Sequence, residues 1–203
     1  MYPSMTEPSK SEATRKKILT TGRELVLKGG FTGVGLSQIL KESGVPKGSF
    51  YYYFSSKEAF GCALLEDYVA EYLESFDALA ETPGSAADRL ATYWDGWLGA
   101  EAADGIAGRC LVVKLAAEIA DLSDDMRRVL DEGVSDLVSR LAALLTEGAD
   151  EGSLRTLPDP EGTASGLYAQ WLGAAILSKL SQDEAPLRQA RADTARRLFP
   201  DIP

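Results

Sequence analysis

The sequence contains no histidine and only two cysteines, Cys62 and Cys110. Without histidine, the usual zinc ligand sets and the usual general base of hydrolases are missing. The cysteines form no Cys-x-x-Cys pair, so we expect free thiols in a reducing compartment and no disulfide framework. We therefore predict a protein that is not an enzyme and has no metal or cofactor. An enzyme with a cysteine nucleophile remains a remote alternative, because no motif for another base is present.

Long hydrophobic runs are also missing. No apolar stretch approaches the roughly 20 residues of a membrane span, which predicts no membrane association. The polar first ten residues lack the apolar core of a signal peptide. We expect a cytoplasmic protein whose residues 1–10 form a disordered tail.

Charge is distributed unevenly along the chain, which has a formal net charge of −10. Residues 1–57 contain nine lysines or arginines and four acidic residues, whereas the remainder contains twelve and twenty-seven. A basic head on an acidic body suggests that the head binds an anionic partner such as nucleic acid. Charge alone does not decide this, because an acidic protein can carry a basic patch.

Apolar residues recur at helical spacing along the chain, and no strand pattern is present. This predicts an all-α fold of about nine helices. The predicted helices cover residues 11–28, 36–43, 47–53, 56–80, 85–101, 110–120, 123–147, 161–181 and 186–199, with a surface loop at 148–160. Ser55 is the predicted N-cap of the fourth helix, and Glu58 completes a capping box.

Residues 36–54 have the pattern of a helix-turn-helix, in which two short helices meet at a turn containing Gly44. The predicted buried seam consists of Leu36, Ile39, Leu40, Val45, Phe50 and Phe54. The second helix would then expose Lys47, Ser49 and tyrosine hydroxyls to phosphates and base edges. The alternative is an ordinary helical hairpin with an aromatic core, although three consecutive tyrosines cannot all face inward.

The block G-F-T-G-V-G-L-S-Q-I-L-K-E-S-G-V-P-K-G-S-F-Y-Y-Y-F-S-S-K-E-A-F, residues 30–60, resembles the DNA-binding domain of TetR-family repressors. The resemblance implies a helix-turn-helix domain at 11–56 and a helical effector-sensing and dimerisation domain at 57–203. It also implies a homodimer on a palindromic double-stranded DNA operator. The residues expected to face DNA are Lys47, Gly48, Ser49, Tyr51 and Tyr52, with Ser37 and Lys57 on phosphates. Tyr52 departs from the pattern, in which histidine is common.

Two further segments, G-R-C-L-V-V-K-L-A-A-E-I-A-D-L-S-D-D-M-R (108–127) and Y-A-Q-W-L-G-A-A-I-L-S-K (168–179), resemble the NemR-type subgroup, known for sensing thiol-reactive electrophiles and oxidants. The thiolate is the reactive form of cysteine. Cys110 follows Arg109, begins a predicted helix and precedes Lys114 by one turn, and all three features favour thiolate. The subgroup pattern also includes Lys179 on the penultimate predicted helix, and the sequence leaves open whether it contacts Cys110. The alternative is that Cys110, like Cys62, is a packing residue.

Two further assignments concern the second domain. Tyr72, Trp94, Trp97, Tyr168 and Trp171 are candidates for lining a pocket, in which a small hydrophobic effector would bind reversibly instead of modifying Cys110. The last two predicted helices carry apolar faces, and the resemblance implies that they form the dimer interface. These faces could instead close the core of a single chain. The face residues are Leu167, Trp171, Ala174, Ala175 and Leu177, then Leu187, Ala190, Ala195 and Leu198.

Overall fold

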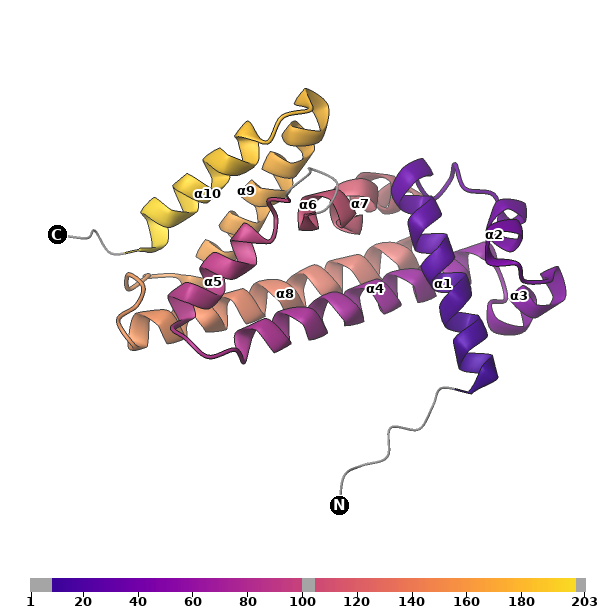
Figure 1. Ribbon diagram of the computed structural model, residues 1–203, viewed down its shortest axis with the longest axis horizontal. Coiled ribbons are helices and arrows are strands. Elements are labelled where there is room, and N and C mark those ends of the chain that lie inside the picture. Colours follow the sequence, from indigo (N-terminus) through magenta and orange to yellow (C-terminus); the bar gives the residue numbers. More distant parts are fainter. Residues whose placement is uncertain (1–8, 100–104, 200–203) are drawn as a thin grey trace, which may run out of the picture. The chain divides into compact units, whose positions relative to one another are not determined.

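The computed structural model describes residues 9–99 and 105–199, and these residues contain ten α-helices (Figure 1). The helices are α1 (Lys10–Gly29), α2 (Leu36–Ser43), α3 (Lys47–Tyr53), α4 (Lys57–Ala80), α5 (Ala86–Asp95), α6 (Ile106–Arg109), α7 (Leu111–Leu122), α8 (Asp124–Asp150), α9 (Pro160–Ser181) and α10 (Ala185–Leu198). Nine of them correspond to the predicted helices, and α6 is an additional single turn. The predicted all-α fold is confirmed. Most of the predicted N-terminal tail, residues 1–8, lies outside the described residues.

Several helix boundaries differ from the sequence prediction. Helix α5 ends at Asp95, not near residue 101, and the turn that follows leads to the undescribed residues 100–104. Helix α4 is capped by Ser56, whose hydroxyl accepts the Ala59 N–H at 2.9 Å. Glu58 does not complete a capping box; its carboxylate accepts a hydrogen bond from the Ser123 hydroxyl at 2.5 Å. The predicted Ser55 cap is therefore wrong by one residue.

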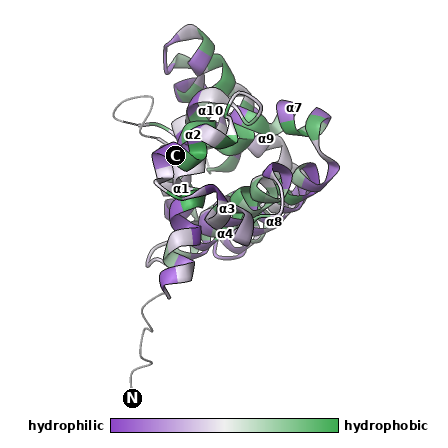
Figure 2. Cartoon of the chain, turned by 90° about the vertical axis from the view of Figure 1, so that its right-hand side faces the viewer, coloured by the Kyte–Doolittle hydropathy of each residue, from purple (hydrophilic) through white to green (hydrophobic). Residues whose placement is uncertain are grey.

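The chain forms two compact units. The first unit combines residues up to Tyr68 with Leu115–Val129, so it holds α1–α3, the first half of α4, most of α7 and the start of α8. Gly22 of α1 allows the close approach of Phe60, since a Cβ at Gly22 would lie 2.4 Å from that ring. Alternating hydrophilic and hydrophobic colours along the helices in Figure 2 reflect their amphipathic sequences.

The second unit combines Val69–Lys114 with Leu130 and the residues after it. Within it, α8 runs alongside α4 (Figure 1). A Cβ at Gly133 of α8 would lie 2.6 Å from the Val69 side chain of α4, so glycine permits this close approach. Helices α9 and α10 pack side by side, and the Trp171 indole N–H donates to the Thr194 hydroxyl at 2.9 Å.

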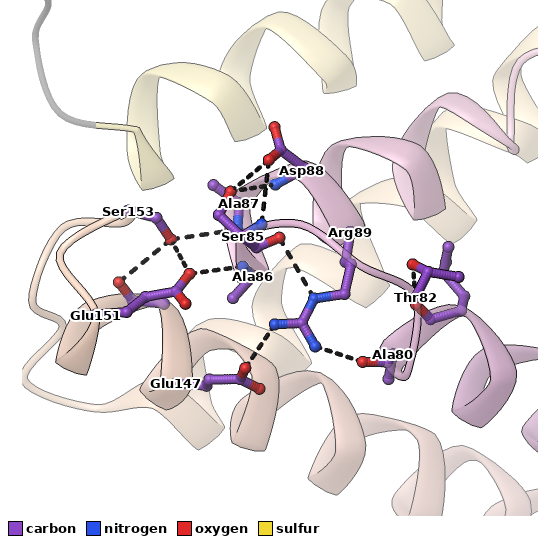
Figure 3. Close-up of polar contacts among 12 residues, drawn as sticks. Ala80, Thr82, Ser85, Ala86, Ala87, Asp88, Arg89, Glu147, Glu151 and Ser153 are labelled. Carbon is purple, nitrogen blue, oxygen red and sulfur yellow. Dashed lines mark hydrogen bonds and ion pairs between the residues drawn. The ribbon is translucent and has the colours of Figure 1, made fainter.

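The connection between α4 and α5 is held by a buried arginine (Figure 3). Arg89 donates to the main-chain carbonyls of Ala80 and Ser85 and pairs with Glu147 of α8 at 2.5 Å. The first N–H groups of α5 are also satisfied, since the Ala86 N–H donates to the Glu151 carboxylate at 2.6 Å. A carboxylate at this end of a helix also interacts favourably with the helix dipole. Side-chain contacts thus fix where α5 begins.

Within the two described ranges, no helix combines the length and apolar character needed to cross a bilayer.

Candidate nucleic-acid interface and cysteine site

The turn between α2 and α3 has the geometry of a helix-turn-helix. Helix α2 ends at Gly44, whose φ of 65° lies in the left-handed region that favours glycine. The Gly44 N–H donates to the Lys41 carbonyl and the Val45 N–H to the Leu40 carbonyl, each at 3.2 Å. After Pro46, which has extended backbone angles, α3 begins at Lys47. Three residues therefore connect the two helices.

Aromatic side chains divide between the interior and the surface of the first unit. Phe50, Phe54 and Phe60 contact one another with ring centroids between 5.2 and 5.5 Å apart, and all three are buried. Tyr51 and Tyr52, by contrast, are 47% and 79% exposed. The hairpin interpretation therefore holds for the phenylalanines but leaves these two tyrosines directed outward.

The residues predicted to face DNA differ in their solvent exposure. Ser37, Lys47 and Gly48 are exposed, whereas Ser49 is half-buried. Lys47 Nζ lies 5.9 Å above the Tyr51 ring, so the cation and the phenol are neighbours on the same exposed surface. A Cβ on Gly48 would meet no other group within 4 Å, which leaves this face of α3 open to a partner.

Lys57 is the exception among these residues. It is half-buried, and its ammonium donates to the Phe31 carbonyl at 2.9 Å while lying 4.8 Å above the Phe31 ring. The Lys57 ammonium thus binds groups of the protein itself, and the contact of Lys57 with DNA phosphate stays a prediction.

Cys110 lies between α6 and α7 and is 2% exposed. The Val113 N–H donates to its sulfur at 3.4 Å, and the Lys114 N–H donates to its carbonyl at 3.1 Å. These are the contacts of an N-cap residue, so the sulfur sits at the positive end of the α7 dipole, as the sequence predicted. Arg109 is exposed and Lys114 is half-buried.

Cys110 interacts electrostatically with a lysine and two tyrosines of the second unit. Burial lowers the pKa of the Lys179 ammonium; Cys110 opposes that shift, whereas Lys114 adds to it. Burial also raises the pKa of the Tyr168 phenol well above its ordinary value, with Cys110 and Tyr93 contributing. Lys179 therefore lies within electrostatic range of both Cys110 and Lys114. Tyr93, which was not among the predicted site residues, belongs to the cysteine site as well.

Cys62 has an acidic environment. Burial raises the pKa of its thiol, and the carboxylates of Asp125, Glu58 and Glu66 raise it further. Burial and these negative charges both disfavour the thiolate of Cys62.

Residues 18–61 match the family model described as "Bacterial regulatory proteins, tetR family", and residues 86–194 match "Tetracyclin repressor-like, C-terminal domain". The HTH-type transcriptional repressor NemR of Escherichia coli K12 is 43% identical over 180 residues, 88% of this chain and 90% of the relative. The chain belongs to the TetR family.

Solved structures of TetR-family proteins have the same fold. A crystal structure of E. coli NemR in its reduced form superimposes with a TM-score of 0.86 at 40% identity, covering 94% of this chain and all of the other. A putative TetR/AcrR-family transcriptional regulator gives 0.83 at 49% identity, covering 91% and 98%. The predicted family and subgroup resemblance are confirmed, and the relatives are repressors rather than enzymes.

The predicted pocket residues gather in one place in this TetR-family protein. Trp94, Trp97, Tyr168 and Trp171 are all buried, and the Trp94 and Trp171 rings stack with centroids 4.9 Å apart. Tyr72 lies at the edge of this cluster, where its hydroxyl is 2.9 Å from that of Tyr93.

The apolar faces of α9 and α10 are used mainly inside the second unit. The buried residues among those predicted are Leu167, Trp171, Ala174, Ala175, Leu187, Ala190 and Leu198. For these residues the alternative interpretation, closure of the chain's own core, is correct. Leu177, the remaining predicted residue of α9, is 57% exposed, and it lies on a stripe with Ile176 and Leu180, which are 45% and 76% exposed. These positions and Gly173, at which a Cβ would meet nothing within 4 Å, follow helical spacing.

Proposed function

We propose that this TetR-family repressor binds a palindromic operator as a homodimer in the cytoplasm and is released when an electrophile or oxidant modifies Cys110. The observation that carries the proposal is the position of the Cys110 sulfur at the N-terminus of α7, within electrostatic range of Lys179. Positive charge and a helix N-terminus both favour the nucleophilic thiolate. Identity of 43% to the repressor NemR supports the assignment.

The head of the molecule supports DNA binding through α3. Lys47 supplies a cation, Tyr51 and Tyr52 supply exposed phenols, and Gly48 leaves the backbone approachable. A second helix of a helix-turn-helix lies in the major groove, and a dimer reads two half-sites about 34 Å apart. We propose that Ser37 and Lys47 contact phosphates while Ser49, Tyr51 and Tyr52 lie near base edges.

For dimerisation we propose the exposed stripe of α9, with a second copy of this chain as its occupant. Leu177 and Leu180 would otherwise leave large apolar side chains in water. Gly173 on the same stripe permits a helix of the partner to approach closely. Packing of α9 against α9 of a second copy would therefore bury the apolar side chains that are exposed in a single chain.

Fluorescence anisotropy tests the proposal, using an operator duplex selected by the protein from a random library. N-ethylmaleimide serves as the electrophile: the thiolate adds across the maleimide double bond, a C–S bond forms, and the neighbouring carbon takes a proton from solvent. We expect operator binding to fall with stoichiometric addition of one reagent mass to Cys110. The adduct would favour a conformation of the second unit that no longer supports operator binding.

Two variants make the test specific. Cys110→Ser retains a small polar side chain that can accept the Val113 N–H, and it should keep its operator in the presence of the reagent. Cys62→Ser is the matched control and should respond as the wild type does. Normal release of Cys110→Ser would refute covalent sensing at this residue.

A second candidate is a repressor released by reversible binding of a small hydrophobic effector among the aromatic residues. The observation that favours it is the Trp94 indole N–H, which is buried without a hydrogen-bond partner among the described residues. A ligand with an acceptor oxygen would satisfy such a donor. Release that dialysis reverses and that leaves the mass of the protein unchanged would support this candidate.

A further inference from the structure

A carboxylate from α7 occupies the turn between α1 and α2 in the first unit. Glu118 accepts hydrogen bonds from the Phe31 N–H at 3.1 Å, from the Thr32 N–H at 2.6 Å and from the Thr32 hydroxyl at 2.6 Å. Hydrogen bonds to an ionised carboxylate are shorter and stronger than those between neutral groups. Three of them join one side chain of α7 to the segment that leads into the helix-turn-helix.

The turn is shaped to receive this carboxylate. Gly30 has a φ of 77° and a ψ of 168°, a combination that is essentially restricted to glycine. A Cβ at Gly30 would also lie 2.9 Å from a Glu118 carboxylate oxygen. Successive main-chain N–H groups in such a turn form a concave site for an anion. Lys57 holds the other side of the same turn through the Phe31 carbonyl.

Helix α7 connects this carboxylate to the cysteine site without a break. Its N-terminus is capped by Cys110, and Glu118 follows eight residues later, about 12 Å along the helix at 1.5 Å per residue. An α-helix moves as a rigid element over this length. Residues 111–114 belong to the second unit and residues 115–122 to the first, so α7 is shared between them.

We infer that Glu118 is a positioning residue that transmits modification of Cys110 to the DNA-binding head. This inference rests on the proposed function of Cys110 as the sensor. A group added to a sulfur that is 2% exposed cannot be accommodated in place, so the N-cap of α7 must shift. The shift displaces Glu118 from the amides of Phe31 and Thr32. The turn before α2 is then no longer held by these hydrogen bonds, and the head leaves its operator-binding arrangement.

The test compares the wild type, Glu118→Ala and Asp121→Ala as full-length proteins. Asp121 is the matched control, since it is an exposed acidic residue on the same helix. The quantity measured is the ratio of operator Kd with and without a complete N-ethylmaleimide adduct on Cys110. Allosteric coupling commonly gives ratios of about 5 to 150. We expect a ratio in that range for the wild type and Asp121→Ala. Reduced Glu118→Ala lacks the hydrogen bonds that hold the turn, so it should bind the operator about as weakly as the adducted wild type. Its own ratio should therefore fall below about 3.

A second measurement does not depend on DNA. Hydrogen–deuterium exchange of the peptide containing Phe31 and Thr32 should accelerate when the wild type acquires the adduct. In Glu118→Ala the exchange should already be fast and should not change further. Thr32→Val, which removes the hydroxyl donor and leaves both N–H donors, should give an intermediate Kd ratio.

The outcomes separate this inference from the proposed function. If the adduct lowers the operator affinity of Glu118→Ala by the same factor as it lowers that of the wild type, the inference is wrong while covalent sensing stands. If folded, reduced Glu118→Ala binds the operator as tightly as the reduced wild type, the hydrogen bonds of Glu118 do not hold the head in its operator-binding arrangement and the inference is also wrong. If the adducted wild type keeps its operator, covalent sensing fails, and unchanged exchange at Phe31 and Thr32 would overturn the inference independently.

Discussion

Replacing Arg89 with alanine removes three hydrogen bonds at the junction of α4, α5 and α8. The guanidinium is 10% exposed, and two of its acceptors are main-chain carbonyls, those of Ala80 and Ser85. The third acceptor, Glu147, is 50% exposed and can regain water when its partner is removed. Removing the buried partner of an ion pair costs about 3–5 kcal/mol, and rehydration of Glu147 moves the expected cost towards about 2–4 kcal/mol.

Equilibrium urea unfolding measures this change in the free energy of unfolding. The protein concentration is kept fixed, because the stability of a dimer depends on it. In a chain of this length each kcal/mol corresponds to about 2–4 °C in Tm. A destabilisation of about 3 kcal/mol therefore predicts a Tm lowered by about 6–12 °C. Arg89→Lys should lie between the wild type and Arg89→Ala, since it retains the charge but not the planar set of donors.

Arg188→Ala is the matched control. Arg188 pairs with Asp183 at 3.0 Å, but its side chain is 58% exposed. Exposed pairs contribute at most about 1 kcal/mol. If Arg89→Ala and Arg188→Ala destabilised the protein equally, burial would not be the property that makes Arg89 important, and the reasoning would fail.

Three further predictions concern DNA binding, assembly and pH. Lys47→Ala should weaken operator binding and reduce the slope of log K against log salt by about 0.9 for each phosphate that the lysine neutralises; an unchanged slope would remove Lys47 from the interface. Leu180→Lys should convert a dimer to a monomer in size-exclusion chromatography with light scattering, whereas Leu122→Lys, at another exposed leucine, should not. Burial raises the pKa of Tyr168 above its unfolded value of about 10, so its contribution to stability is present below pH 10 and is lost as the pH rises further. Tyr168→Phe should therefore lose less urea stability than the wild type between about pH 9.5 and 11.5, and equal losses would contradict this assignment.

The helix-turn-helix could be predicted almost completely because its signals are local. The left-handed turn at Gly44, the seam residue Ile39 and the buried Phe50 all follow from spacing within twenty residues. The position of Cys110 at the start of a helix was predictable for the same reason. Local signals also misled in one case, since Ser55 and Ser56 are adjacent and either can begin a capping pattern; the structure uses Ser56.

Long-range contacts explain what the sequence could not predict. Glu118 binds a turn 86 and 87 residues away, and no periodicity or motif connects the two segments. The faces of α9 show the same limitation. Both the buried stripe with Trp171 and the exposed stripe with Leu180 are apolar, so hydrophobicity alone cannot tell which one packs within the chain. That choice depends on how α10 lies against α9.

The burial of Cys110 has a consequence for the timing of a response. A reagent can reach a sulfur that is 2% exposed only during brief local openings of the surrounding helices. When those openings close faster than the chemistry proceeds, the observed rate is the chemical rate multiplied by the open fraction. At high reagent concentration the rate should level off at the opening rate itself. Under the proposed function, such a sensor responds slowly to a short pulse of reagent, and the opening rate sets the fastest response that it can give.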